Sequence, residues 1–462
     1  MNLEFLKNRE EKYWFKSDKR SEFSVSGPLT QEKVRMISEF KDDPNWVTDR
    51  RLQGLEVFNN STMPKFGPDL HEINFKKMIY YSKPSKKFNE WKDIPKDIKE
   101  TFEKLGISKP EMKVLAGLEL QYDSEIIFEK AKDGLKKLGV VYMSMDEAVK
   151  KHPDIVKKYM GLLIPPTDNK FAALNTAVWS GGTFIYVPPG VKVPFPLHTY
   201  FRINLERFGQ FERTLIVVDE GAEVTYVEGC TAPIHSEAVL HAAVVEVIAL
   251  PRAKVKYITL QNWSKNVYNL VTKRAQAHEN AFIQWIDGNF GSKATMKYPS
   301  IYLSGEGAKG EVVTIAVVSG GQDIDSGAGM VHLAPNTSSN MVSKTISMGS
   351  GISTFRGFLR ILKSAEFSKA SILCDSLLLE DSTSNAIPRI DVKNTTSSVE
   401  HEAKMGNLDK EKLFYLTSRG IDEKTAMSMI VFGFVREFVK ELPMEYALEL
   451  QRLINLDMGG QQ

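Results

Sequence analysis

Short apolar runs fill the middle of the chain, between residues 169 and 402. The runs are rich in Val, Ile, Thr, Tyr and Phe, and Gly, Pro, Asn or Asp separates each run from the next. Runs of this length, with turn residues between them and little helical periodicity, predict β-strands. We therefore expect one large, mainly β domain over residues 169–402. Its clearest predicted strands cover residues 183–187, 215–218, 223–227, 244–249, 255–260, 282–286 and 312–318.

The length of this β region narrows the choice of architecture. A β-sandwich usually takes roughly 100 residues, and residues 169–402 are more than twice as many. A solenoid or a double barrel fits this length better. The sequence has no strict hexapeptide or nonapeptide repeat, so its periodicity alone leaves both architectures open.

Helical patterns flank the β region on both sides. Residues 146–160 hold apolar side chains at helical spacing, with Pro153 as a break inside the pattern. After residue 402, Asp422 is placed to cap a helix that Pro443 ends. This apolar helix either packs on the β domain or docks a partner. Its expected apolar face consists of Met429, Ile430, Phe434, Phe438 and Val439, and a last helix would carry Tyr446, Leu450 and Leu453.

The expected organisation therefore has three parts. An N-terminal, mostly helical domain covers residues 1–168, the β core covers residues 169–402, and a C-terminal helical domain covers residues 403–462.

Composition and charge exclude several classes of protein. The 60 Lys and Arg residues nearly balance the 58 Asp and Glu residues, so the chain lacks the basic surplus of a dedicated nucleic-acid binder. The longest uncharged stretch, residues 171–191, contains paired glycines and paired prolines that suit strands and turns better than a membrane-spanning helix. No secretory signal is visible at the N-terminus. Two cysteines in 462 residues suit a reducing compartment. We expect a soluble, cytoplasmic protein that binds neither nucleic acid nor a membrane.

The common catalytic motifs are missing from the sequence. It has no phosphate-binding loop of the form G-x-x-x-x-G-K-[ST], no dinucleotide-binding glycine pattern and no H-E-x-x-H zinc motif. We therefore expect that the chain does not hydrolyse nucleotides by itself.

The first candidate site combines Cys374 with the Glu400-His401-Glu402 triplet. A thiolate, an imidazole and carboxylates together form a plausible ligand set for iron. The alternatives are ordinary ones: a lone cysteine in a strand is commonly a small buried hydrophobe, and a charged triplet is commonly a solvated turn. The sequence alone leaves both interpretations open.

The second candidate is Cys230, which follows a predicted strand and precedes Pro233. A thiol at such a position is either exposed and reactive or packed in the core. A cysteine that passes sulfur onward needs thiolate character, which a nearby Lys or Arg would favour.

Polar residues at period two form a third candidate. Tyr200, Arg202 and Asn204 alternate with apolar residues, and Gln261 and Trp263 flank Asn262 in the same way. Period two places alternate residues on one face of a strand. That face is either exposed to solvent or, in a solenoid, part of an interior where unpaired polar groups would cost about 1–3 kcal/mol each.

A fourth candidate belongs to another class of function. Asp323 and Asp325 are two residues apart and could form a carboxylate pair for glycoside cleavage on a β-helix. Acidic residues in such a loop are more often turn formers.

Several longer motifs resemble the SufB branch of the SufB/SufD family of iron–sulfur cluster assembly proteins. They follow one another in the family's order from about residue 169 to the C-terminus, and together they are highly specific. The motifs are FAALNTAVWSGGTFIYVPPGV, YFRIN, GQFERTLI, YVEGCTAP, LQNW, YNLVTKRA, CDSLLL, VEHEAKMGNL, LFYLTSRGI and MSMIVFGF.

The resemblance implies a fold and a function. The fold is a right-handed parallel β-helix core with helical domains at both ends. The function is that of an assembly scaffold rather than an enzyme: it accepts sulfur and iron, builds a transient iron–sulfur cluster at a subunit interface and releases it to apoproteins. The implied partners are SufC, an ABC-type ATPase that docks on the C-terminal helices, SufD or a second copy of the chain through the β-helix, and a cysteine desulfurase or other sulfur donor. Reduced FAD is associated with some complexes of the family.

The resemblance also assigns roles to individual residues. Cys374 matches the cluster-site thiolate, with Glu402 and His401 beside it as further cluster-site residues. Cys230 matches a sulfur acceptor. Five residues match a route for sulfur through the helix interior: Arg202, Asn204, Gln261, Trp263 and Lys273. The chain departs from many members in lacking an N-terminal cysteine-rich motif, so no role of that motif is expected here.

Two alternatives to the scaffold function stay open at this point. One is a β-helix enzyme that acts on polysaccharides through Asp323 and Asp325. The other is a SufD-like structural partner without sulfur chemistry, which the presence of both Cys230 and the Cys374–Glu402 set argues against.

Overall fold

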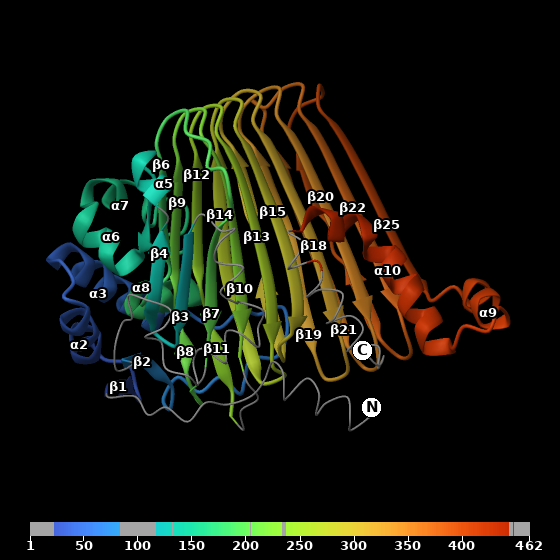
Figure 1. Cartoon of the computed structure of the whole chain (residues 1–462), viewed down its shortest axis with the longest axis horizontal. Helices are drawn as coiled ribbons and strands as arrows, with labels where there is room; N and C mark the ends of the chain where they lie inside the picture. Colours follow the sequence, from blue (N-terminus) through green and yellow to red (C-terminus); the bar gives the residue numbers. More distant parts are fainter. Residues whose placement is uncertain are drawn as a thin grey trace.

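A parallel β-solenoid forms the body of the protein, and helices lie at both of its ends (Figure 1). The computed structural model describes residues 23–83, 117–131, 133–203, 205–232, 237–442 and 447. The mainly β fold class with flanking helices is confirmed, and of the two architectures that the sequence left open the solenoid is the correct one.

The first wall of the solenoid is a sheet of ten strands. From β7 to β25 neighbouring strands are parallel, as are β3 and β7, and only β4 is antiparallel to its neighbour. The strands are β3 (Gly117–Tyr122), β4 (Glu125–Ala131), β7 (Leu197–Arg202), β10 (Glu223–Thr231), β13 (Lys254–Trp263), β15 (Phe282–Gly291), β18 (Lys309–Val318), β20 (Ser338–Ser347), β22 (Lys369–Leu378) and β25 (Ser398–Asn407).

The second wall is a sheet of 13 strands that faces the first. It consists of β5 (Val141–Ser144), β6 (Thr183–Val187), β8 (Gly209–Gln210), β9 (Arg213–Val218), β11 (Val239–His241), β12 (Val244–Ala249), β14 (Val267–Ala277), β16 (Ala294–Lys297), β17 (Ser300–Leu303), β19 (Asp323–His332), β21 (Ile352–Ile361), β23 (Thr383–Ala386) and β24 (Arg389–Val392). Every strand expected from the sequence lies within one of these elements. The strands of the two walls begin before residue 169 and end after residue 402.

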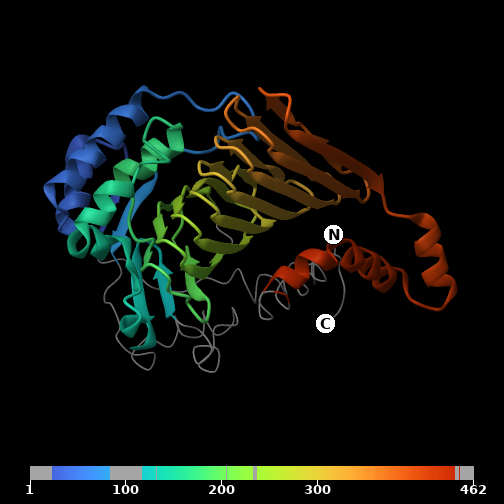
Figure 2. The ribbon, with the colours of Figure 1, turned by 90° about the horizontal axis from the view of Figure 1, so that it is seen from above.

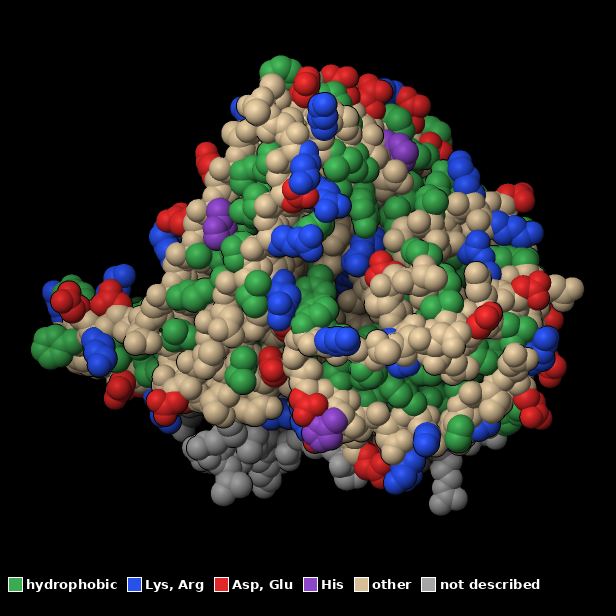
Figure 3. Space-filling view, turned by 180° about the vertical axis from the view of Figure 1, so that it is seen from behind, with side chains coloured by type: hydrophobic (Ala, Val, Ile, Leu, Met, Phe, Trp, Pro, Cys, Tyr) green, Lys and Arg blue, Asp and Glu red, His purple; other side chains and the backbone are tan. Residues whose placement is uncertain are grey.

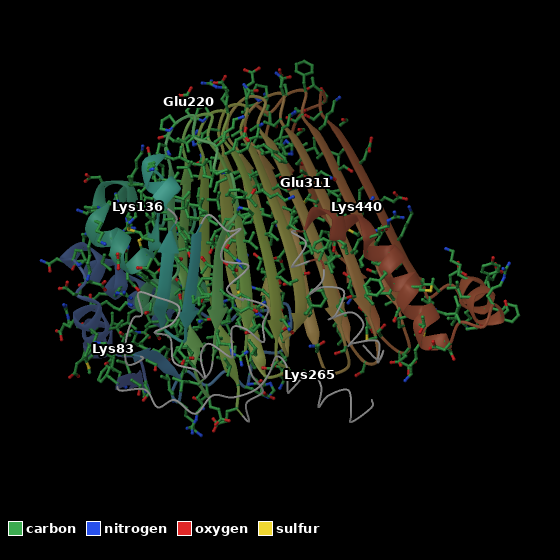
Figure 4. The ribbon with its side chains drawn as sticks, in the orientation of Figure 1. Lys83, Lys136, Glu220, Lys265, Glu311 and Lys440 are labelled. Atoms are coloured by element: carbon green, nitrogen blue, oxygen red, sulfur yellow. The ribbon has the colours of Figure 1, made fainter. Side chains whose placement is uncertain are left out.

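The chain alternates between the two walls, and each full turn takes roughly thirty residues. Tight turns connect the walls at both edges, where Glu220 marks one edge and Lys265 the other (Figure 4). Alternate side chains of each strand point between the walls. There they form the main apolar core, which includes Val255, Trp285 and Met341. The stacking of turns buries this core continuously, as expected for a solenoid.

Gly291 shows how closely two turns approach each other. It ends β15 with a φ of +77°, and a Cβ atom built there would lie 1.6 Å from the carbonyl oxygen of Trp263 on the neighbouring turn. Only glycine fits both the left-handed conformation and this spacing.

The N-terminal helices cover the first turns of the solenoid (Figures 1 and 2). The expected helix over residues 146–160 is confirmed, and Pro153 breaks it into two. Apolar residues of three of the helices, such as Val34, Leu55 and Leu174, pack with Leu240 and Leu270 of the second wall. The helices are α2 (Gln31–Lys41), α3 (Asn45–Asn60), α5 (Asp133–Lys137), α6 (Met145–Lys151), α7 (Pro153–Tyr159) and α8 (Lys170–Val178), and a small antiparallel sheet of β1 (Phe23–Ser26) and β2 (Ile79–Lys83) accompanies them.

The C-terminal helices are α9 (Lys410–Ser418) and α10 (Glu423–Glu441). The side chain of Asp422 accepts a hydrogen bond from the backbone N–H of Thr425, which confirms the expected N-cap. The helix lies across the outer face of the first wall, where Val431, Val435 and Phe438 pack on the sheet. The expected apolar face was partly wrong, because Met429 is 50% exposed. The expected last helix, with Tyr446, Leu450 and Leu453, lies outside the described residues, as does Pro443.

No helix within the described parts of the chain is long and apolar enough to span a membrane. From behind, where the second wall faces the viewer, Lys and Arg side chains form a broken band down the middle of the surface (Figure 3).

The burial of His332, at the end of β19, predicts that the free energy of unfolding depends on pH. Its side chain is fully buried between the hydroxyls of Thr337 and Ser339, both 2.8 Å from its ring nitrogens. Burial lowers the pKa of His332 to about 4. Because the unfolded chain takes up this proton near pH 6.5 and the folded chain does not, stability falls as the pH drops from about 6.5 to 4. The loss from this group is about 3 kcal/mol.

Urea unfolding at several pH values measures this loss. The variant His332→Gln should flatten the decline relative to the native chain. The matched control is His71→Gln, whose side chain in the native chain is 72% exposed. An unchanged slope in His332→Gln would contradict the expectation.

Candidate functional site

One row of polar residues crosses the inner face of the first wall. Backbone register places its members opposite one another on six neighbouring parallel strands, and each is at most 3% exposed. We call it the inner polar row, and in order along the solenoid it consists of Glu228, Thr259, Asp287, Thr314, Ser343 and Cys374. Polar side chains in such an enclosed row are costly unless they are paired, so their presence calls for an explanation.

The row connects the two cysteines of the chain. Cys230 lies two residues beyond Glu228 on β10 and therefore points to the same interior. Cys374 ends the row on β22, five strands further along. With about 4.8 Å between neighbouring strands, the two cysteine positions are roughly 24 Å apart along the solenoid. Two thiols at this separation cannot meet directly, so any chemistry that links them must pass through the interior.

Lysines from the second wall meet the row beside Cys230. The Lys297 Nζ atom lies 2.7 Å from an Asp287 oxygen and donates to Gln261 Oε1 at 2.8 Å. The Lys273 Nζ atom donates to Thr259 Oγ1 at 2.7 Å and lies 3.8 Å from Glu228 Oε1 and 3.9 Å from Asp287 Oδ1. Opposite charges therefore alternate inside the solenoid.

The pKa values of this group follow from burial and from its neighbours. Burial lowers the pKa of Lys297 to about 8 against the opposing attraction of Asp287. Burial raises the pKa of Asp287, but Lys297 and Lys273 outweigh it and hold that pKa below its usual value. The buried carboxylate therefore stays charged because two ammonium groups compensate it.

Cys230 is fully buried within β10, so the interpretation of an exposed thiol after the strand was wrong. Burial raises its pKa well above the usual value, the charges of Glu228 and Glu212 raise it further, and Lys273 and Lys297 only partly oppose them. The expected thiolate character is therefore not present at rest. The thiol donates a hydrogen bond to Glu228 Oε1 at 3.7 Å.

Gln261, Trp263 and Lys273, which the sequence singled out, all face the interior near Cys230. Gln261 is the register partner of Cys230 on the next strand, and its Oε1 also accepts from Asn269. The Trp263 ring packs against the ring of His241, with 4.7 Å between centroids. The solenoid interior, rather than a solvent face, is therefore the environment of these three side chains.

Arg202 lies elsewhere. Its register partner is Thr231, so it sits on the opposite face of the wall from Cys230, where its guanidinium donates to Thr231 Oγ1 at 3.0 Å. It is nevertheless fully buried. Asn204 lies outside the described residues.

Cys374 is buried in the main core at the far end of the solenoid. Burial, with a contribution from Asp375, raises its pKa to about 11, so iron binding there would displace a proton. Its register partner on the last strand, β25, is Ala403. His401 is two residues before Ala403 and shares the inner face with Cys374, about 8 Å away between Cα atoms. Glu402 is on the outer face and pairs with Lys404 at 2.7 Å.

The structure thus brings Cys374 and His401 to one face and leaves Glu402 on the other. Within the described residues no three His, Cys, Asp or Glu side chains are grouped so that they could hold a metal ion. Cluster ligation at this end requires either movement of β25 or ligands from another chain.

The last turn of the solenoid is open. No strand of the described residues continues the first wall after β25, and His401 is exposed although it faces inward. Four apolar side chains of this turn are each at least 37% exposed: Ile387, Ile390, Val392 and Met405. An apolar surface next to an unpaired strand edge is typical of an interface with another chain.

Asp325 is unsuited to glycoside cleavage. Both of its carboxylate oxygens accept hydrogen bonds from Arg356, at 2.7–2.9 Å, and Tyr298 donates to the same carboxylate at 2.8 Å. A carboxylate held in this way stabilises the second wall and is not available as an acid or base. The arrangement counts against the polysaccharide-acting alternative.

The comparisons with known proteins identify the family of this chain. Residues 201–434 match the family model for the SufBD core domain of SUF system FeS cluster assembly, and residues 121–198 match the model for the SufBD N-terminal region. The chain belongs to the SufBD family. It is 52% identical over 453 residues to the iron–sulfur cluster assembly protein SufB of Bacillus subtilis, which covers 98% of this chain and 97% of the relative.

Other members are nearly as similar. Iron–sulfur cluster assembly SufBD family proteins of Staphylococcus haemolyticus and Staphylococcus aureus are each 50% identical over 451 residues, which is 97% of this chain and 97% of each relative. The family matches therefore extend over nearly the whole chain.

Sequence reasoning missed several members of the site: Glu212, Glu228, His241, Asp287 and Lys297. A signal for two of them was present. Glu228 and Asp287 each follow two apolar or aromatic residues at period two, as in VTYVEGC and IQWIDGN. A charged residue on such a face indicates either a solvent face or a functional interior.

Proposed function

We propose that this chain is a scaffold on which sulfur and iron combine into a cluster that is then released to other proteins. The observation that carries the proposal is the inner polar row, which joins a buried thiol among charged groups to a second thiol at the open end. A structural partner without sulfur chemistry would have no need for such a row, because replacing it by apolar residues is commonly neutral or stabilising.

In this proposal Cys230 accepts sulfur from a cysteine desulfurase or another sulfur donor. Gln261, Trp263 and Lys273, together with the inner polar row, form the interior route toward Cys374. Arg202 and Asn204 are the remaining residues assigned to this route by the family resemblance; Arg202, on the opposite face of β7 from the interior, would act outside the route itself.

The cluster is assembled at Cys374, with His401 and Glu402 as further cluster-site residues. One thiolate supported by imidazole and carboxylate holds a cluster less firmly than four thiolates do. The separation of His401 and Glu402 on two faces of β25 favours a site that a second chain completes. That chain is SufD or a second copy, bound at the open last turn. Weak ligation that is shared between two chains suits a cluster that has to be released to another protein.

The partner ATPase SufC docks on the C-terminal helices. A groove between α9 and α10 is lined by residues that include Tyr415, Leu416 and Met429, and Phe414 nearby is 74% exposed. Since α10 packs on the outer face of the first wall, movement of the helix pair would act on the strands that carry the inner polar row. This chain would contribute no ATP hydrolysis of its own.

Three further expectations belong to the proposal. The division into domains 1–168, 169–402 and 403–462 places most of the solenoid in the middle part, although β3, β4 and β5 precede residue 169 and β25 ends at Asn407. The cytoplasm is the expected location, because the cysteines are free thiols. Reduced FAD in the complex stays a prediction from the family resemblance.

Anaerobic reconstitution tests the proposal. The chain is mixed with ferrous iron, L-cysteine, a cysteine desulfurase and the partner ATPase, and visible absorption, iron and acid-labile sulfide are measured. We expect a cluster that an apo-ferredoxin then removes. A chain that forms the complex but holds neither iron nor sulfide would instead be the structural partner, and the proposal would fail.

A further inference from the structure

The Cys230 thiol has a carboxylate as its hydrogen-bond partner in the solenoid interior. Glu228 and Cys230 are two residues apart on β10, and the sulfur atom lies 3.7 Å from Glu228 Oε1. Phe201 and Trp263 belong to the same buried apolar cluster as Cys230, and Gln261 is the register partner of Cys230 on the next strand. Within the described residues, Glu228 is the ionisable group in direct contact with this thiol.

A thiol in this position keeps its proton until it reacts. Burial and the nearby charges of Glu228 and Glu212 raise the pKa of Cys230, and the lysines Lys273 and Lys297 do not offset them. Since the thiolate is the nucleophilic form, the proton must leave during the attack on a sulfur donor. The acceptor of that proton has to be inside the solenoid.

We propose that Glu228 takes the proton from Cys230 as its sulfur attacks a persulfide and then returns that proton to the departing sulfur of the donor. The new S–S bond joins Cys230 to the terminal sulfur of the donor persulfide, and the donor's own S–S bond breaks. The products are a persulfide on Cys230 and the thiol of the donor, so protons balance and no external oxidant or reductant is needed. The inference rests on the proposed role of Cys230 as sulfur acceptor.

Two neighbours hold the Glu228 carboxylate in place. Tyr257 donates a hydrogen bond to Glu228 Oε2, and the pKa of Tyr257 is raised well above its usual value by burial and by Glu228. The phenol therefore stays a donor. Lys273 approaches Oε1 and is fixed by Thr259 and by the ring of Tyr257, 4.6 Å from its centroid. Oε1 is thus directed at both the thiol and the lysine, while Oε2 is tied to the phenol.

The variant Glu228→Gln distinguishes a proton acceptor from a structural residue, because the two roles predict opposite changes in the rate of sulfur uptake. Removal of a negative charge lowers the pKa of Cys230, so a merely structural Glu228 predicts faster sulfur uptake in the variant. A proton acceptor predicts slower uptake, by roughly 100-fold. The amide keeps the shape of the side chain and an oxygen for the Tyr257 hydrogen bond.

The experiment measures sulfur uptake by the full chain from glutathione persulfide under anaerobic conditions. Peptide mapping by mass spectrometry follows the gain of one sulfur atom on Cys230. The matched control is Glu119→Gln: Glu119 lies on β3, in register with Glu228 but two strands before it and outside the six residues of the inner polar row, is similarly buried, and is hydrogen-bonded to Thr183 and Thr199. We expect the control to keep the native rate.

A pH profile adds a readout that a structural role would not change. In the native chain the uptake rate should change little with pH around neutrality, because a group inside the site accepts the thiol proton. In Glu228→Gln it should rise about tenfold per pH unit, because only preformed thiolate reacts. The titrating and charged groups that face Cys230 are Glu228, Glu212, Lys273 and Lys297, and all but the first are kept in the variant.

The outcomes are distinguishable. Uptake by Glu228→Gln that equals or exceeds the native rate overturns the inference. If Cys230 of the native chain gains no sulfur at all, the acceptor role itself fails, whatever Glu228 does. Should Glu228→Gln not fold, Glu228→Asp decides: it keeps the charge but withdraws the carboxylate by one methylene, and native-rate uptake by the folded variant would count against Glu228 as acceptor.

Discussion

Alanine at position 374 is expected to abolish cluster formation while the chain stays folded. Cys374 is the thiol at the open end of the solenoid, and the other thiol of the chain, Cys230, is five strands away. No thiol of this chain can therefore substitute for Cys374 as an iron ligand at that end. His401 and Glu402 alone offer imidazole and carboxylate, which do not hold sulfide-bridged iron as thiolates do.

Reconstitution with iron, a desulfurase and the partner ATPase measures the effect. We expect visible absorption and acid-labile sulfide of Cys374→Ala to fall to the level of a mixture without the scaffold. The matched control is Ile372→Val, two residues earlier on the same inner face of β22, which removes one buried methylene at a cost of about 1 kcal/mol. A native yield of cluster in Cys374→Ala would refute the assignment of this end as the assembly site.

The individual strands could be predicted from the sequence, but their stacking into a solenoid could not. Each predicted strand, such as 244–249, was recognisable by its β-branched residues and by the turns around it. The solenoid leaves no strict repeat in the sequence because each inward position only has to be apolar or polar. In one half of each strand the inward side chains are apolar, and in the other half they are polar, but no particular residue type is required. Tyr226, Tyr257 and Trp285 are an example. They are register partners on three neighbouring strands and occupy equivalent positions, but the residue type is not the same at all three.

The helix α10 shows a second limit. Apolar residues lie on more than one side of it, so the pattern could not decide which side packs. The structure buries Val431, Val435 and Phe438 on the first wall and exposes Met429 toward the groove with α9. An apolar helix face that binds a partner and one that packs in the core have the same sequence pattern, so a single sequence does not distinguish them.

The site residues that the family's motifs assign could be predicted from the sequence. The site residues that no motif assigns were missed, because physical reasoning from the sequence alone did not identify them. Gln261, Trp263 and Lys273 do line the interior near Cys230. The charged residues between them, Glu228 and Asp287, went unnoticed because a polar residue at period two usually indicates a solvent face. Only the second wall, which closes over these positions in the folded chain, turns that face into an interior.

Methionine at position 297 is expected to destabilise the solenoid by about 3–5 kcal/mol. Lys297 and Asp287 are at most 3% exposed, and the ammonium lies within 2.9 Å of both carboxylate oxygens. Removal of the lysine leaves the buried carboxylate with Lys273, 3.9 Å away, and with a hydrogen bond from Asn289. Breaking one partner of a buried pair costs more than the pair itself contributes.

Urea unfolding of Lys297→Met measures this loss. The control is Lys254→Met, which removes an exposed ion pair with Glu223 at 3.0 Å on the first wall and should change stability by less than about 1 kcal/mol. A loss in Lys297→Met as small as in this control would contradict the expectation that Asp287 is charged and compensated in the interior.

The double variant Lys297→Met, Asp287→Leu then decides why the pair exists. Because replacement of a whole buried pair by apolar residues is often neutral or stabilising, we expect it to recover most of the lost stability. If the recovered protein still takes up sulfur at Cys230 but no longer delivers it to Cys374, the charges serve transfer rather than folding. Native delivery through an apolar position 287 would mean that sulfur does not pass along the inner polar row.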